Sequence, residues 1–437
     1  MTGMVGDPGS VRALAGQVRD GALTARALVE HCLARIDAVD DVVRAWISVD
    51  AEGALAEADA CDTETGQGRL RGPLHGVPFA IKDVIDVAGW PTRAGSRSRD
   101  DAPPARIDAT VVARLRAQGA IPLGKVHTTE FAYFDGVPPT RNPYDLTRTP
   151  GGSSGGPGAA IASGTVPFAL GTQTAGSVSR PAAYCGIGAF KPSTLSVVGA
   201  GVTPFAPSYD TVGVFAATAA DAAFVMQAMA PEGLGLAGVV SAGAPAEAVF
   251  LDDPLIADKA DVSVTAAMAA LRADFASAGV AVREAAAPVP LGEVLALHRT
   301  VILYEVSRVH AGLLDVADRV GPRLIADIRH GLKIEDSAYR EALAALIAAR
   351  RAFWGALPWP ALTVVPAAPG PAPIGEATGD PSFISPLTAL GGPIASVPAG
   401  TCPQTNMPLG AMLCVPPGCD AELVAALSGA TEGPLTR

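Results

Sequence analysis

The amino-acid sequence predicts one large α/β domain over residues 1–437, with a mixed, twisted sheet flanked by helices. Short apolar runs bounded by glycine, proline or aspartate alternate with segments of helical periodicity, which is typical of this fold class. Hydrophobic residues make up 49% of the chain and charged residues 17%, which indicates a large core and excludes a disordered protein. Residues 355–375 and 381–418 carry no charge but are repeatedly interrupted by proline and glycine, so they indicate buried strands and turns rather than membrane spans.

The first half of the chain predicts helices followed by a strand-rich region. Residues 10–60 are expected to be helical: Ser10 can cap a helix, and apolar side chains follow at near-helical spacing at Leu14, Val18, Leu28, Cys32 and Ile36. We then expect these elements: a buried strand at 77–81, a helix at 107–118, a strand at 120–124 and a strand at 167–170.

The second half predicts a further β-α-β unit, a helical region and a return to strands. The expected elements are strands at 248–251 and 280–282 around a helix at 261–278, helices over 300–356, strands at 361–366 and 394–398, and a helix at 420–428. Within the one domain we therefore expect a helical N-terminal region over 10–60, a central core over 70–215 and a smaller lobe over 240–345.

Charge and cysteine usage exclude several classes of protein. The net charge is −11 and no basic run is present, so a nucleic-acid partner is not expected. The six cysteines are scattered without a C-x-x-C pair, which argues against a zinc site and a disulfide framework. The N-terminus lacks the pattern of a signal peptide. We therefore expect a cytoplasmic protein without a membrane partner.

One of only five lysines, Lys82, ends the apolar run of 78–83, PFAIKD. A lysine in such surroundings must reach water, a partner or a neutral state. One interpretation is a surface-reaching lysine paired with Asp83 or Asp86. The other is a buried, functional amine.

A glycine- and serine-rich segment, TPGGSSGG, covers 149–156. A flexible loop is one interpretation. The segment also fits G-x-S-x-G around Ser153 or Ser154, the pattern of a hydrolase nucleophile elbow. The elbow should follow a strand, whereas 144–150 is polar, and it needs a downstream histidine. The histidines available, which all lie in predicted helices, are His298, His310 and His330.

The segment 171–186, GTQTAGSVSRPAAYCG, follows the predicted strand at 167–170. Ser177 is expected to open a helix, where unpaired backbone N–H groups can hold an oxyanion. An ordinary capping serine would explain Ser177, but it would not explain the run of small residues around it.

Together these segments resemble the amidase signature family. The spacing of 24 residues between Ser153 and Ser177 agrees with that family, as do three flanking segments: GVPFAIKDVIDVAGWPTRAGS (76–96), FKPS (190–193) and DTVG (210–213). The resemblance is strongest over 70–215. Within the family, the wording around Ser177 and the later TGDPSF (378–383) are most similar to malonamidase.

The resemblance implies an acyl-enzyme mechanism. Ser177 would be the nucleophile, Ser153 would follow a cis peptide bond and relay the proton, and Lys82 would be the neutral general base. The oxyanion hole would be formed by the backbone N–H groups of Thr174, Ala175, Gly176 and Ser177. No metal or organic cofactor is implied.

The sequence departs from the family's pattern at positions that bear on substrate binding. Gln173 stands where many members have aspartate; in the glutaminase subunit of amidotransferases an acidic residue in this region helps to hold the substrate's amino group. Ala175 stands where glycine is commoner. Arg180 has two interpretations: a structural arginine that ties the start of the helix to a carboxylate of the protein, or a fork that binds the carboxylate of an acidic substrate. Gln173 and Arg180 are thus the candidate substrate-binding residues.

The expected function is hydrolysis of a small amide. Carbamate (urethane) hydrolysis as the main activity is an alternative, since it uses the same acyl-enzyme chemistry, and an ester side activity is compatible with it. A glutaminase-type subunit of an amidotransferase complex is another, and a binding protein without activity is a third. The expected partner is a small-molecule substrate, the expected assembly a monomer or homodimer, and selectivity is expected from loops within 127–145 and 300–390.

Overall fold

The structure is a computed structural model that describes residues 4–134, 136–197, 199–230, 247–358, 360–375, 377–429 and 433–435. Within these ranges, eleven strands form one mixed sheet in the order β1-β3-β2-β4-β6-β5-β10-β11-β9-β7-β8. The strands are β1 (Trp46–Val49), β2 (Pro78–Lys82), β3 (Ile121–Val126), β4 (Phe168–Gln173), β5 (Gly188–Lys191), β6 (Thr211–Ala216), β7 (Glu247–Asp252), β8 (Ala281–Ala286), β9 (Leu362–Pro366), β10 (Ile394–Thr401) and β11 (Pro408–Cys414). The predicted fold class, a single α/β domain with a mixed sheet, is confirmed.

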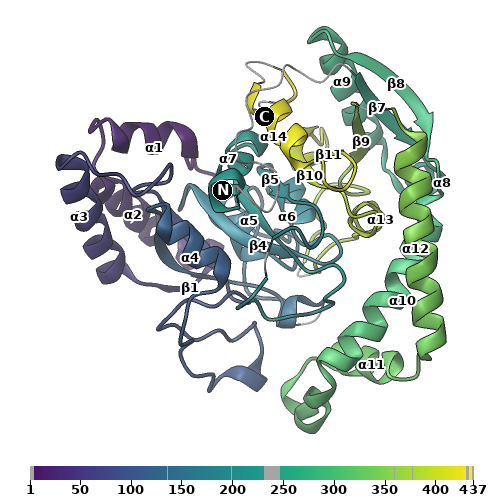
Figure 1. Ribbon diagram of the computed structural model, residues 1–437, viewed down its shortest axis with the longest axis horizontal. Helices are drawn as coiled ribbons and strands as arrows, with labels where there is room; N and C mark the ends of the chain where they lie inside the picture. Colours follow the sequence, from purple (N-terminus) through teal and green to yellow (C-terminus); the bar gives the residue numbers. More distant parts are fainter. Residues whose placement is uncertain are drawn as a thin grey trace.

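Helices surround this sheet (Figure 1). The α-helices are α1 (Val11–Arg19), α2 (Ala25–Val43), α3 (Ala51–Gly66), α4 (Thr110–Ala117), α5 (Gly155–Ala162), α6 (Ser179–Cys185), α7 (Ala219–Met229), α8 (Pro254–Lys259), α9 (Val262–Ser277), α10 (Leu291–Val309), α11 (Pro322–Gly331), α12 (Asp336–Ala356), α13 (Ile384–Ala389) and α14 (Asp420–Gly429). Short 3₁₀ turns are η1 (Arg97–Arg99), η2 (Glu130–Ala132) and η3 (Ala311–Arg319). No helix within the described ranges is long and apolar enough to cross a membrane.

The N-terminal region is helical, as predicted, with one strand that the sequence did not indicate. Ser10 caps α1 by accepting a hydrogen bond from the Ala13 N–H, and α1, α2 and α3 lie together at one end of the molecule (Figure 1). Between α2 and α3 the chain forms β1, which pairs antiparallel with β3 and becomes the sheet edge. Four residues between two long helices carry too little periodicity to be recognised as a strand.

Alternating side chains of the central strands enter two separate cores. Phe79 and Ile81 of β2 belong to the core on the face covered by α4 and α7, where Phe79 stacks on Phe168 of β4 at 5.2 Å. Ala80 points to the opposite face, where it meets the alanine-rich α5. Because successive strand residues face opposite sides, the small side chains of one face allow α5 to lie close to the sheet.

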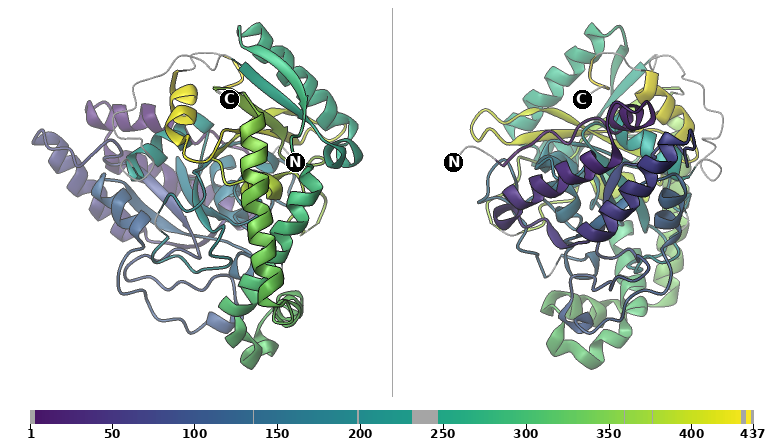
Figure 2. Two further views of the ribbon diagram at one scale, coloured as in Figure 1. Left: turned by 45° about the vertical axis from the view of Figure 1, so that its right-hand side comes forward. Right: turned by 90° about the vertical axis from the view of Figure 1, so that its left-hand side faces the viewer.

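The second half of the chain extends the same sheet and adds an outer layer of helices. The predicted β-α-β unit is confirmed: β7 and β8 are parallel, and α9 lies between them in sequence. Figures 1 and 2 show α10 and α12 side by side along one flank of the molecule, with α11 at their end. The two halves are joined where β5 pairs antiparallel with β10, with Phe190 opposite Ala395.

The helix start near Ser177 and several short elements differ from the expectations. The helix after the oxyanion segment begins at Ser179 and not at Ser177, so Ser177 stands in the turn before α6. Strands β5, β6 and β11 and helices α5, α7, α8 and α13 were not predicted. Most of them are short or lie in glycine- and proline-rich sequence, where propensity is a weak guide and pairing decides the structure.

Candidate active site

The amine of Lys82 lies inside the protein at the end of β2. Its side chain is 0% exposed, and Nζ lies 2.7 Å from both Ser153 Oγ and Thr172 Oγ1. Burial lowers the pKa of Lys82 well below its usual value, and the negative charge of Asp210 partly opposes that shift. The interpretation of Lys82 as a surface lysine paired with a neighbouring aspartate is wrong.

The aspartate after Lys82 has a different partner. Asp83 lies 3.4 Å from Nζ of Lys125, a second buried lysine, which also donates to the Thr92 hydroxyl. Lys82 and Asp83 are adjacent in sequence but contact different groups. Lys82 contacts two hydroxyl groups, and Asp83 compensates the charge of Lys125.

The serine-rich segment is an ordered turn that leads into α5, not a flexible loop. The peptide bond between Gly152 and Ser153 is cis, as the family resemblance implies. Close packing explains the glycines after it: a Cβ on Gly156 would lie 2.4 Å from the backbone nitrogen of His127. Ser153 faces Lys82, and α5 begins two residues later.

Ser154 does not fit the nucleophile elbow that the G-x-S-x-G pattern raised. Its side chain is 0% exposed, and its hydroxyl donates to the backbone carbonyl of Thr172. The three histidines that an elbow would need lie in helical regions: His298 in α10, His310 at the end of α10 and His330 in α11. None of them has a hydrogen bond to Ser153, Ser154 or Ser177 among those of the described residues.

Ser177 stands in the turn between β4 and α6. Its side chain is 8% exposed, and its hydroxyl has no hydrogen-bond partner within the described ranges. The structure therefore joins Lys82 and Ser153 by a hydrogen bond, but it does not join Ser177 to them in this way. The link between the two segments is β4, because Thr172 contacts Lys82 and the turn that carries Ser177 starts at residue 174.

The backbone of residues 174–177, which we call the oxyanion loop, is held by its carbonyl groups. The Thr174 carbonyl accepts from His298 Nε2 at 3.0 Å, and the Ala175 carbonyl accepts from the Thr388 hydroxyl at 2.6 Å. The backbone N–H groups of residues 174–177 have no acceptor in the described part of the chain. They are thus available to a ligand.

Sequence reasoning missed the residues that support this loop. Thr172 lies within the segment 171–186 but was assigned no role, whereas His298 and Thr388 lie far along the chain and belong to none of the recognised motifs. A threonine at a strand end and a histidine on a helix look like ordinary core residues. The only local signal was the position of Thr172 within the segment 171–186.

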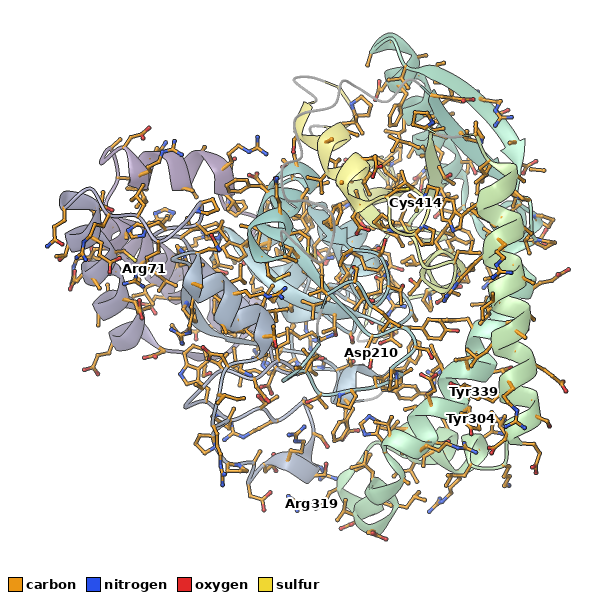
Figure 3. All side chains as sticks on the ribbon, viewed as in Figure 1. Arg71, Asp210, Tyr304, Arg319, Tyr339 and Cys414 are labelled. Carbon is orange, nitrogen blue, oxygen red and sulfur yellow. The ribbon has the colours of Figure 1, made fainter. Side chains whose placement is uncertain are left out.

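The other side of the oxyanion loop is tied to Asp210. The Thr174 hydroxyl donates to Asp210 Oδ1 at 2.5 Å, and Asp210 Oδ2 accepts from the Phe205 N–H at 2.7 Å. Removal from water raises the pKa of Asp210, and these hydrogen bonds oppose the rise. Figure 3 labels Asp210 between the sheet and the α10–α12 pair that carries Tyr304 and Tyr339.

Gln173 makes contacts within the protein that account for most of its hydrogen-bonding groups. Its Oε1 accepts from the N–H groups of Val178 and Ser179, and its Nε2 donates to Thr388. The side chain is 0% exposed. These contacts cap the start of α6 with a neutral group and fix Thr388. A role of Gln173 in substrate binding stays a prediction.

Three hydrogen bonds join the Arg180 guanidinium to backbone carbonyl groups. Its Nε and one terminal nitrogen donate to the Gly152 carbonyl at 3.1 and 2.5 Å, and the other terminal nitrogen donates to Gly379 at 2.7 Å. Burial lowers the pKa of Arg180 to about 10. The contacts match the structural interpretation of this arginine, although the expected carboxylate partner is replaced by two carbonyl groups.

The loop predicted to select substrates is attached to the outer helices. Glu130 accepts from the Ser96 hydroxyl at 2.6 Å and from the Gly321 N–H at 2.7 Å, just before α11. The Tyr133 hydroxyl donates to Asp327 within α11. The segment 127–134 therefore connects the central core with the outer helical layer near η3 and α11.

The cysteines and acidic groups form no metal-binding cluster in the part of the chain that is described. No three His, Cys, Asp or Glu side chains gather there in a way that could hold a metal ion. The six cysteines are all free.

Comparison with known proteins agrees with this arrangement. A family model described as "Amidase" matches residues 27–236. The chain is 44% identical over 226 residues to one subunit of the glutamyl-tRNA(Gln) amidotransferase of Chloroflexus aurantiacus, a match that covers 51% of this chain and 46% of that relative. The chain therefore aligns with only about half the length of that protein.

Solved structures match over nearly the whole chain. A crystal structure of an amidase superposes with a TM-score of 0.87 at 30% identity, covering 96% of this chain and 98% of that one. The native peptide amidase of Stenotrophomonas maltophilia gives a TM-score of 0.80 at 27% identity, with 96% of both chains covered. The chain belongs to the amidase family. The finer resemblance to malonamidase stays a prediction.

Proposed function

We propose that this protein is a serine hydrolase that cleaves the C–N bond of small amides through an acyl-enzyme on Ser177. In this mechanism Ser153 relays the proton and Lys82 is the general base. The observation that carries the proposal is the placement of Lys82: a buried amine 2.7 Å from the Ser153 hydroxyl, with no carboxylate hydrogen-bond partner among the described residues. Neutral lysine has a lone pair that can accept the serine proton.

The proposed reaction has two halves. Ser177 Oγ attacks the amide carbonyl carbon while its proton moves to Ser153 Oγ, and the Ser153 proton moves to Lys82 Nζ. The resulting oxyanion is held by N–H groups of the oxyanion loop. When the tetrahedral intermediate collapses, the C–N bond breaks and the proton returns through Ser153 to the leaving amine. Water then hydrolyses the acyl ester by the same relay.

The free hydroxyl of Ser177 supports its role as nucleophile. Ser177 is largely buried, at 8% exposure, and its hydroxyl has no competing hydrogen bond within the described residues, whereas the Ser154 hydroxyl donates to the Thr172 carbonyl. The proposed relay requires the Ser177 hydroxyl to donate to Ser153 Oγ once substrate is bound. Hydrogen bonds of this kind are often long in free enzymes and tighten with substrate.

A glutaminase-type role within an amidotransferase is the second candidate, because a relative with 44% identity over 226 residues belongs to such an enzyme. The contacts of Gln173 count against it. The position is neutral and its amide is used to cap α6, so it presents no carboxylate to a substrate's amino group. Carbamate hydrolysis as the main activity remains an alternative that uses the same residues.

The test is a substrate panel with the purified protein alone. We expect turnover of at least one small amide without a partner protein, and covalent labelling of Ser177 by a fluorophosphonate probe, located by mass spectrometry. A preference for carbamates would select the alternative substrate class. Release of ammonia from glutamine only after a partner is added would favour the amidotransferase role, and labelling at a different serine would refute the assignment.

A further inference from the structure

We infer that His298, together with Thr388, is a positioning residue that orients the oxyanion hole from the second half of the chain. The inference rests on the proposed hydrolase function and adds to it. It concerns residues outside the segment 27–236 that the family model matches. Its starting point is that successive carbonyl groups of the oxyanion loop have hydrogen-bond donors from three different helices.

The geometry of the peptide group connects these carbonyl contacts to the N–H groups. In a trans peptide the C=O of one residue and the N–H of the next lie in one plane and point in opposite directions. The His298 bond to the Thr174 carbonyl therefore sets the direction of the Ala175 N–H. In the same way, the Thr388 bond to the Ala175 carbonyl sets the direction of the Gly176 N–H.

The third peptide unit is held from within the loop's own helix. The Arg180 N–H donates to the Gly176 carbonyl at 2.9 Å, which sets the direction of the Ser177 N–H. Three consecutive peptide units are thus fixed through their carbonyl groups, from α10, α13 and α6. The N–H groups of these three peptide units have no acceptor in the described part of the chain. Each N–H group points away from the side chain or backbone group that donates to the carbonyl of the same peptide unit.

His298 is suited to a fixed position. It is buried in α10, its ring packs 4.5 Å from that of Tyr209, and burial lowers its pKa to about 4. It is therefore neutral at ordinary pH and carries one ring proton. Since a carbonyl can only accept, that proton is on Nε2. The contact gives the oxyanion loop a donor without adding a positive charge to it.

The consequence for catalysis is specific to the transition state. A neutral amide carbonyl gains little from donors aimed at an oxyanion, whereas the tetrahedral intermediate gains much. Loss of one oxyanion donor costs about 10²–10³-fold in kcat in other hydrolases. Loss of a residue that only orients such a donor should cost less, on the order of tenfold, with KM little changed.

The experiment compares His298→Leu and His298→Gln with the wild-type enzyme. For each variant, kcat and KM for a small amide are measured, together with the inhibition constant of a trifluoromethyl ketone that forms a tetrahedral adduct. We expect His298→Leu to lower kcat and to weaken the ketone by a similar factor. We expect His298→Gln, whose side-chain amide can donate to Thr174, to recover most of both.

Two further comparisons keep the result interpretable. His310→Leu removes another buried histidine from the end of α10, where it packs on Phe131 and Phe205, and should not change the ratio of KM to the ketone's inhibition constant. If His298→Leu does not fold, Thr388→Val and Thr388→Ser test the neighbouring peptide unit. Thr388→Ser keeps the hydroxyl and should therefore keep the kcat and the ketone inhibition constant of the wild type.

The outcomes separate the inference from the proposed function. A wild-type protein that neither hydrolyses amides nor reacts with a fluorophosphonate would refute the function itself. An active wild type whose His298→Leu and Thr388→Val variants lose only thermal stability, with kcat and ketone binding unchanged, would overturn the positioning role alone.

Discussion

Arg180 donates two hydrogen bonds to the carbonyl oxygen of Gly152, the residue directly before Ser153. A third bond, to the Gly379 carbonyl, fixes the same guanidinium to the segment before α13. The planar fork of arginine suits this task because several donors with fixed geometry can meet two acceptors. Arg180 therefore holds the serine turn in place from the first helical turn of α6.

We predict that Arg180→Leu lowers activity toward acidic and neutral amides by similar factors. The substitution leaves the buried carbonyl of Gly152 and the part-buried carbonyl of Gly379 without this donor, at a cost of up to about 1–3 kcal/mol each. The free energy of unfolding should fall together with kcat. Steady-state kinetics on one acidic and one neutral amide, with Arg180→Lys as the matched variant, check this. A selective rise in KM for the acidic substrate would instead favour direct carboxylate binding.

Ser177 and Ser154 give a matched pair of serine variants. Ser177→Ala should reduce turnover on the order of 10⁶-fold, as expected for loss of a nucleophile, while leaving the circular dichroism spectrum unchanged. Ser154→Ala removes a hydroxyl that only contacts Thr172 and should keep fluorophosphonate labelling. Intact labelling of Ser177→Ala would show that the nucleophile is elsewhere.

The activity should rise with pH along its acidic limb. Lys82 can accept a proton only in its neutral form, and burial moves its pKa well below the usual value, so the neutral form persists at lower pH than for a solvated lysine. Activity should therefore fall as pH drops through this lowered pKa. The measurement is kcat/KM across pH. Lys82→Ala should lose about 10²–10⁴-fold or more and should lack this limb.

The lowered pKa of Lys82 also predicts that this residue lowers the free energy of unfolding near neutral pH. In the unfolded chain a lysine binds its proton up to about pH 10.4, whereas the folded protein releases it at lower pH. Between these two values the unfolded state binds more protons, so stability rises with pH. Lys82→Met should unfold at a higher temperature than the wild type near pH 7.

The control for this prediction is pH itself. The difference in unfolding temperature between Lys82→Met and the wild type should shrink as pH approaches 10, because the lysine is then partly neutral in both states. Thermal unfolding followed by calorimetry at pH 7 and near pH 10 gives the comparison. An equal difference at both values would contradict the linkage.

Local pattern predicted the elements with clear periodicity and missed those defined by pairing. The Ser10 cap, the strand at Lys82 and the β-α-β unit around α9 were all readable from the sequence. Strand β5 was not, because its definition depends on β6 and β10, and β10 is distant along the chain. Such contacts leave no short-range signal.

The candidate active site likewise contains residues that local motifs point to and residues that only distant contacts define. Motifs singled out Lys82, Ser153 and residues 174–177 as candidates, since small residues and a rare lysine stand out in composition. The supports at His298 and Thr388 act on backbone carbonyl groups, which every residue has. A donor to a carbonyl needs only the right place in space, so no spacing in the sequence could indicate it.

The pairing of β5 with β10 has a consequence for how the chain folds as it is made. Synthesis proceeds from the N-terminus, so residues 192–393 must follow β5 before the start of its partner, Ile394, emerges. At about 5–20 residues per second this takes roughly 10–40 s. During that time β5 is a bare edge in the middle of the future sheet. Such an edge can pair with other chains, so translation speed and chaperone capture should influence the yield of this protein.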